Sequence, residues 1–404
     1  DAIEEELAPK LSAHTDAINL NAELFERIQH VHAVRNDLNL DAESVWLIER
    51  YYRDFVHAGA KLGINEREEL KALNEKLSKL GTKFSQNLLA DTNELAIVVD
   101  DVADLDGLEP GQIDSAAAAA AARGLDGKWL ITMVNYTGNP ALASLTNRGL
   151  REKIMKASLS KGGRANDNDN RSLLLEMVKL RAQRAALMGF KSHAEYVLSE
   201  QTAGNLTNVH NMLRKIAPAA VANAKREAAD LQKAIDAEGG KFELASWDWD
   251  LYTERVRVEK YNVDTTLFKP YFELERVLND GVFWAATKLF GITFEPRSDL
   301  KAYHPEARVW EVKNEDGSAL GLYIGDFYTR DSKRGGAWMS AFVEQNHLLG
   351  QLPVVFNNMN VPKPPAGSPT LLTFDETATL FHEFGHALHG LLSNVTYPRF
   401  SGTS

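Results

Sequence analysis

Apolar residues recur every three or four positions through most of the first 290 residues of the chain. Residues 41–62, for example, place Ile48, Tyr52 and Phe55 on one side of a helix and charged residues on the other. Residues 65–89 repeat this pattern with leucines. Both segments have more apolar residues than the narrow seam of a coiled coil, so we expect long helices that pack on one another.

The pattern changes after about residue 290. Residues 308–330 alternate between apolar and polar positions, are rich in β-forming residues and contain the hairpin signal Asp316-Gly317. Residues 351–360 are a further candidate strand. The sequence therefore predicts a mainly α-helical protein with a small antiparallel sheet directly before its last helix.

Composition and charge exclude several classes of function. The 404 residues are 44% hydrophobic and 25% charged, as in an ordinary folded protein. The net charge of −11 is spread along the chain and no basic stripe is present, so we expect no nucleic-acid partner. No apolar run approaches the roughly 20 residues that span a bilayer, so we expect no membrane partner. The chain has no cysteine, which is compatible with the cytoplasm, the compartment we expect, and with the periplasm.

The last predicted helix contains the sequence TFDETATLFHEFGHALHG. Thr373 and Glu376 match a capping box, so the helix should begin near Phe374, and we expect it to end near Ser393. Leucine and phenylalanine surround the polar residues, which indicates a buried helix with one ionisable face.

His382 and His386 are four positions apart, so they lie on one helical face, close enough to share an ion. Zinc binds imidazole nitrogen at about 2.0–2.1 Å, and catalytic zinc sites keep one position open for water. Glu383 borders the same face, where it can hold that water and accept its proton. The alternative is a pair of unliganded core histidines, but burying these three groups without a partner would be costly. We therefore predict one zinc ion per active site, bound by His382 and His386, with Glu383 as the catalytic base.

Two other residues of this helix are weaker candidates. His389 is seven residues from His382, about 10 Å along a helix, which is too far for both to bind one small ion. We expect His389 and Glu376 to lie beside the site, in its cleft or behind its ligands, without binding the metal.

The third ligand distinguishes the classes of zinc peptidase. The metzincin pattern requires Gly at position 389 and His at position 392, where this chain has His389 and Leu392, so that class is excluded. Gluzincins use a Glu located farther along the chain. The eighteen residues after His386 contain no Asp or Glu. Asp375 and Glu376 are upstream candidates, but their position at the start of the same helix suits a capping role.

The motif HEFGHALH, together with other stretches of the chain, resembles the thimet-oligopeptidase family, and the bacterial peptidyl-dipeptidases of that family are the most similar. The stretches are MGFKSHAEY (188–196), WDWDLYTERVR (247–257), LFKPYFELERVLNDGVFW (267–284), YHPEARVWEV (303–312) and GDFYTRDSKRGGAWMSAFVEQ (325–345). HEFGH alone is moderately specific, whereas the ordered set is highly specific and extends through most of the chain.

This resemblance implies a zincin-type metallopeptidase with two mostly helical lobes on either side of a deep channel, with zinc at its floor. Residues 1–290 would form the channel wall, and residues 291–404 the first part of the zinc-binding region. Only short peptides would reach the metal. By the same resemblance His382 and His386 are ligands and Glu383 is the general base.

The resemblance also implies that the third ligand, a Glu, lies beyond Ser404. We therefore expect the chain to be incomplete at both ends. A C-terminal segment of the same protein, present as a separate chain, would supply the Glu. A nick after the small polar residues SGTS (401–404) would produce such a segment.

Three activities remain as alternatives. The resemblance favours release of C-terminal dipeptides over internal cleavage of oligopeptides. The third alternative is that the protein binds peptides without cleaving them, although the presence of Glu383 weighs against it.

The strand Leu320–Phe327 is expected to be a sheet edge that binds the substrate backbone, with a purely structural hairpin as the alternative.

Overall fold

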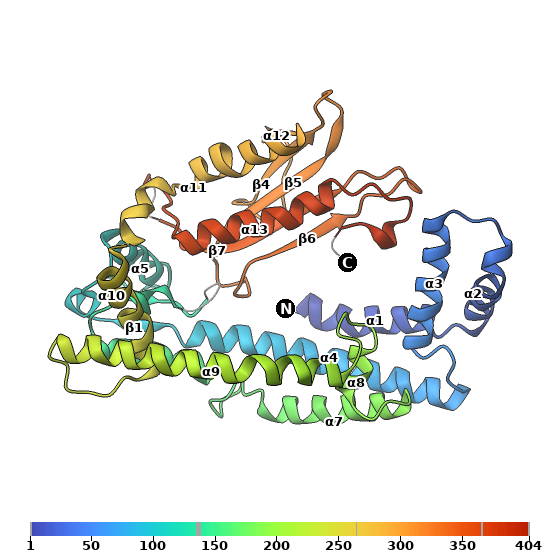
Figure 1. Cartoon of the computed structure of the whole chain (residues 1–404), viewed down its shortest axis with the longest axis horizontal. Helices are drawn as coiled ribbons and strands as arrows, with labels where there is room; N and C mark the ends of the chain where they lie inside the picture. Colours follow the sequence, from blue (N-terminus) through green and yellow to red (C-terminus); the bar gives the residue numbers. More distant parts are fainter. Residues whose placement is uncertain (1, 135–138, 264, 365–366, 403–404) are drawn as a thin grey trace. The chain divides into compact units, whose positions relative to one another are not determined.

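The computed structural model describes residues 2–134, 139–263, 265–364 and 367–402. It is mainly α-helical, as the sequence predicts (Figure 1). The helices are α1 (Ala2–Asn19), α2 (Ala22–Val34), α3 (Ala42–His57), α4 (Ile64–Glu94), α5 (Pro110–Ala122), α6 (Arg148–Ser160), α7 (Arg171–Leu187), α8 (His193–Leu198), α9 (Leu206–Ala237), α10 (Trp249–Tyr261), α11 (Leu274–Arg276), α12 (Trp284–Phe290) and α13 (Phe374–Leu391). The strands are β1 (Ile97–Val99), β2 (Trp129–Ile131), β3 (Thr293–Pro296), β4 (Arg308–Lys313), β5 (Ala319–Tyr328), β6 (Trp338–Val343) and β7 (Val354–Val361). Among the described residues, no helix is both long and apolar enough to cross a membrane.

The chain forms two compact units. The helical unit comprises residues 1–91 and 160–227, and the sheet unit comprises residues 92–159 and 228–404. This division differs from the boundary at residue 290 that the sequence suggests. Many of the helices before residue 290 belong to the same unit as the sheet, because helical residues such as Leu278 are part of the core that covers it.

Aromatic packing between α2 and α3 forms the core of the helical unit. Phe25 and Phe55 are buried, and their stacked rings have centroids 6.3 Å apart. The ring of Tyr52 also stacks on Phe25, with centroids 5.9 Å apart. Two of the periodic apolar positions of residues 41–62, Tyr52 and Phe55, therefore face this core, as the helical pattern predicts.

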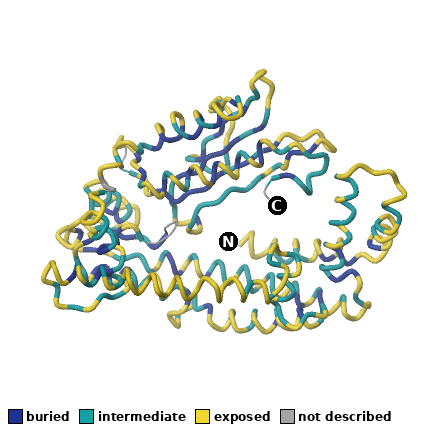
Figure 2. Tube along the Cα trace, in the orientation of Figure 1, coloured by how far each residue is buried: buried dark blue, intermediate teal, exposed yellow. Residues whose placement is uncertain are grey.

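The five-stranded sheet has the order β3-β4-β5-β7-β6. Its neighbours are antiparallel except β5 and β7, which pair in parallel, so the sheet is mostly but not wholly antiparallel. β5 lies between β4 and β7, and the prediction that Leu320–Phe327 is an edge is wrong. The physical reason is burial: most of β5 and β7 is buried (Figure 2), and a strand that is apolar on both faces is stable only in the interior of a sheet. The edges are β3 and β6.

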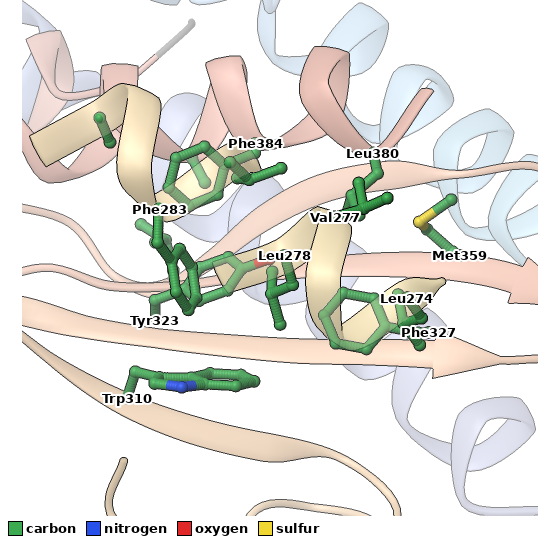
Figure 3. Close-up of a cluster of buried hydrophobic side chains, with 14 of the residues drawn as sticks. Leu274, Val277, Leu278, Phe283, Trp310, Tyr323, Phe327, Met359, Leu380 and Phe384 are labelled. Atoms are coloured by element: carbon green, nitrogen blue, oxygen red, sulfur yellow. The ribbon is translucent and has the colours of Figure 1, made fainter. Parts of the chain in front are cut away.

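One apolar core joins α13 and the helical stretch 274–290 to the same face of the sheet (Figure 3). Phe384 of α13 lies edge-on to Tyr323 of β5, with ring centroids 5.3 Å apart, and 5.8 Å from Phe283. A smaller cluster, which includes Val309 and Ile324, covers the opposite face. The main core fixes the orientation of α13 on the sheet, because burial of Phe384 turns the other side of the helix outwards.

Candidate metal centre

The start of α13 is set by the predicted capping box. The amide of Glu376 donates to Thr373 Oγ1 at 3.1 Å, and the amide of Thr373 donates to Glu376 Oε2 at 2.8 Å. The helix begins at Phe374, as expected, and ends at Leu391, two residues before the predicted end. The register of α13 is therefore fixed by local chemistry as well as by the core.

Close packing holds the far end of α13 against the sheet. A Cβ atom on Gly390 would lie 2.8 Å from Met339 Cε of β6 and 2.9 Å from Val355 Cγ1 of β7. Both distances are shorter than van der Waals contact, so the helix can approach the two strands this closely only because residue 390 has no side chain. The approach brings α13 next to the edge strand β6.

His382 and His386 lie on the exposed side of α13, and their rings are in contact. Their Nε2 atoms are 3.2 Å apart, and their rings are nearly perpendicular, at 87°. Two nitrogens bound at about 2.0–2.1 Å to one tetrahedral zinc ion lie roughly 3.3 Å apart. The separation of these nitrogens is therefore close to that of two ligands of one zinc ion.

Glu383 follows His382 on the buried side of α13 and is 8% exposed. No hydrogen bond from another described residue reaches its carboxylate, so its oxygens are available to accept a proton from a water molecule. Its backbone carbonyl accepts a hydrogen bond of 2.8 Å from Asn357 Nδ2. Asn357 is fully buried on β7, and it therefore ties this turn of α13 to the sheet.

The other candidates do not join the histidine pair. The ring of His389 is exposed and takes no part in the contact between His382 and His386. The Glu376 carboxylate is buried at the helix start, where it caps the backbone. Across the residues that the structure describes, no group of three or more His, Asp or Glu side chains is arranged to bind a metal ion. The described residues thus bring together two candidate ligands, His382 and His386.

A buried ion cluster holds the segment that leads into β6. Asp326, which is fully buried, accepts hydrogen bonds from Tyr303 (2.9 Å), Arg330 (2.8 Å) and Lys333 (2.9 Å). Burial raises the pKa of Asp326, but the hydrogen bonds from Arg330 and Lys333 outweigh it and hold the pKa below its usual value. Lys333 Nζ also donates to three backbone carbonyls, one of them that of Met359 on β7 at 2.8 Å. The connection from β5 to β6 is thereby fixed to the sheet.

Sequence reasoning did not identify Asn357 or Lys333. The signals were present as polar residues within apolar surroundings: NNMN inside a strand, and Lys333 between two predicted strands. A polar side chain in a buried strand needs a hydrogen-bond partner, which makes such positions candidates for fixing a neighbouring element.

Replacing Glu376 with Gln should stabilise the protein at neutral pH. Burial raises the pKa of Glu376 above its ordinary value of 4.5, and the hydrogen bonds with Thr373 reverse this only in part. When the pKa of a carboxyl group is higher in the folded state than in the unfolded state, the folded protein loses stability as pH rises through that pKa. Gln keeps the acceptor for the Thr373 amide without the buried charge. In denaturant titrations, the advantage of Glu376→Gln over the wild type should therefore grow from about pH 4 to about pH 7.

The matched variant Glu376→Ala removes the acceptor and should lower the free energy of unfolding by about 0.5–2 kcal/mol. A Gln variant that is less stable than the wild type at neutral pH would contradict a capping role that needs no charge.

Comparison with known proteins places these features in context. The model of "Peptidase family M3" matches residues 141–404. The chain is 44% identical over 402 residues to dipeptidyl carboxypeptidase of Escherichia coli (strain K12), covering all of this chain and 59% of that protein. It is 30% identical over 407 residues to oligopeptidase A of the same organism, covering 99% of the chain and 60% of the relative. Organellar oligopeptidase A of Arabidopsis thaliana is 32% identical over 363 residues, which cover 86% of the chain and 46% of that protein. The chain thus spans about three-fifths of the length of the bacterial relatives, and the matches confirm the resemblance that the motifs indicate.

Proposed function

Because this chain belongs to peptidase family M3, we propose that the full-length protein is a zinc-dependent peptidase that releases dipeptides from the C-terminal ends of short peptides. The observation that carries the proposal is the 3.2 Å separation of the two Nε2 atoms, with Glu383 next to His382 on the same helix. The higher identity to dipeptidyl carboxypeptidase than to oligopeptidase A supports dipeptide release over internal cleavage.

The side chains of α13 have distinct chemical roles in this proposal. A zinc ion held by His382 and His386 would supply Lewis acidity towards the scissile carbonyl and towards a water molecule. To bind it, each imidazole must be neutral and keep its proton on Nδ1, leaving the Nε2 lone pair free. Glu383 accepts the proton of the attacking water and returns it to the nitrogen of the leaving amine. The hydrogen bond from Asn357 to the Glu383 carbonyl keeps this base in register with the two ligands.

A third ligand is proposed to come from outside the described residues. Catalytic zinc sites use three protein ligands, and the residues described here bring only His382 and His386 together. The third ligand is proposed to be a Glu in a more C-terminal segment of the full-length protein.

The substrate backbone is proposed to pair with β6. This strand hydrogen-bonds to β7 on one side, and no described strand pairs with its other side. It lies next to α13, as the close approach of Met339 to Gly390 shows, and the Asp326–Lys333 cluster holds the segment before it. An extended peptide added to this edge would pass beside the histidine pair.

A test with an N-acetylated tetrapeptide distinguishes the three activities. Dipeptide release predicts one free C-terminal dipeptide, and no cleavage when the substrate's terminal carboxylate is replaced by an amide. An internal peptidase would cleave both substrates, and a peptide-binding protein would cleave neither. We propose the cytoplasm as the compartment of the protein, with the periplasm as the alternative.

A further inference from the structure

The helical unit contains a cavity of about 560 Å³ that is separate from the residues of the metal centre. One side of α3 forms most of its wall, and the rest comes from His32 of α2, the turn after α7 and the residues that follow α8. The turn belongs to the motif MGFKSHAEY, which the metal chemistry does not explain. The volume is within the roughly 300–1,000 Å³ typical of sites for small organic ligands.

The lining combines a flat apolar surface with cationic groups. Val56 and Phe190 line the apolar part, and Trp46 is 50% exposed, so much of its ring is open to a ligand. The Arg53 guanidinium lies 5.8 Å from the centre of the Trp46 ring. An aromatic group placed against Trp46 would therefore have a cation next to it.

Two arginines and two glutamates line this wall, and both glutamates are already paired with arginines. Arg53 Nε is 3.2 Å from Glu200 Oε2, and Arg50 Nη1 is 3.6 Å from the same oxygen, so two guanidinium groups share one carboxylate of the cavity. The other acid of the lining, Glu49, is 3.0 Å from Arg35 Nε. Within the described part of the chain, the two terminal nitrogens of Arg53 have no hydrogen-bond partner. These two parallel donors suit an incoming carboxylate.

We propose that this cavity binds an aromatic carboxylate, with its ring against Trp46 and its carboxylate on the terminal nitrogens of Arg53. Such a group occurs in a free aromatic acid and at the C-terminal end of a peptide whose last residue is aromatic. The site uses residues of the helical unit alone, so it stands or fails independently of the proposed peptidase activity.

Calorimetric titration of the full-length, zinc-loaded protein tests the proposal. N-acetyl-L-tryptophan should bind, whereas its amide should bind at least about tenfold more weakly because it lacks the carboxylate. Arg53→Gln and Trp46→Ala should each weaken binding of the acid to a similar extent. The matched controls Arg27→Gln and Tyr51→Ala, which change exposed residues outside the cavity of the same unit, should leave it unchanged.

A second arm uses the Glu383→Gln background, in which peptide cleavage is expected to be slow, and a tetrapeptide that ends in tryptophan. Tighter binding of this peptide than of N-acetyl-L-tryptophan, lost in Arg53→Gln, would assign the site to peptide ends, and equal binding would assign it to the free acid. Equal affinity for acid and amide, full binding by Arg53→Gln, or no binding by the folded wild type would each overturn the proposal.

Discussion

Glu383→Gln should lower kcat/KM for an N-acetylated tetrapeptide by about 10²–10⁴-fold in the full-length protein, the range expected when a general base is removed. The change replaces a carboxylate by a neutral amide of the same shape, so the helix and its core should be unaffected. The two metal ligands, His382 and His386, remain, and one zinc ion per active site should still be measured by elemental analysis.

Glu376→Gln is the matched control, because it makes the same chemical change on the same helix in a residue assigned to capping. It should keep nearly full activity. If Glu383→Gln retained nearly full activity while holding its zinc, Glu383 would not be the base.

Residues 1–404 alone should bind zinc more weakly than the full-length protein and should be a poor catalyst. Two neutral imidazoles do not compensate the positive charge of the zinc ion. They also fill only two of its four tetrahedral positions, so solvent must fill the other two. Any donors from outside these residues that stabilise the developing oxyanion would also be missing, at a cost of roughly 10²–10³-fold in rate for each. Competition with a chromophoric chelator measures the zinc affinity, and release of dipeptide measures the rate.

The control is His386→Ala, introduced into both forms. This change should abolish the remaining zinc affinity of the 404-residue chain, because only one of the two assigned ligands, His382, is then left. Equal rates for the 404-residue chain and the full-length protein would refute this account. So would loss of zinc from the 404-residue chain on Asp375→Asn, since that would identify an upstream carboxylate as the third ligand.

The parts of the structure that could be predicted from sequence are those set by local periodicity. The capping box determined where α13 begins, and a spacing of four residues was enough to bring His382 and His386 to a common point. Both depend only on helical geometry, which is the same in every protein.

The order of the strands could not be predicted in this way. Alternation of residues identifies β5 as a strand, but its position between β4 and β7 depends on which distant segment covers its second face. The same holds for Asn357, whose partner is 26 residues away on a different element. The grouping of residues 92–159 with the sheet is also set by packing between distant segments.

The order of the sheet also constrains how this unit assembles. β4 and β5 are consecutive and can pair as a local hairpin as soon as both have been synthesised. β6 is made next, but its described partner is β7, which follows it in the chain. During synthesis the segment Trp338–Val343 therefore remains unpaired until β7 has been made, and its largely apolar side chains are exposed to other nascent chains. The strand proposed to receive substrate thus joins the sheet only when β7 pairs with it, and slow pairing of β7 should increase aggregation during folding.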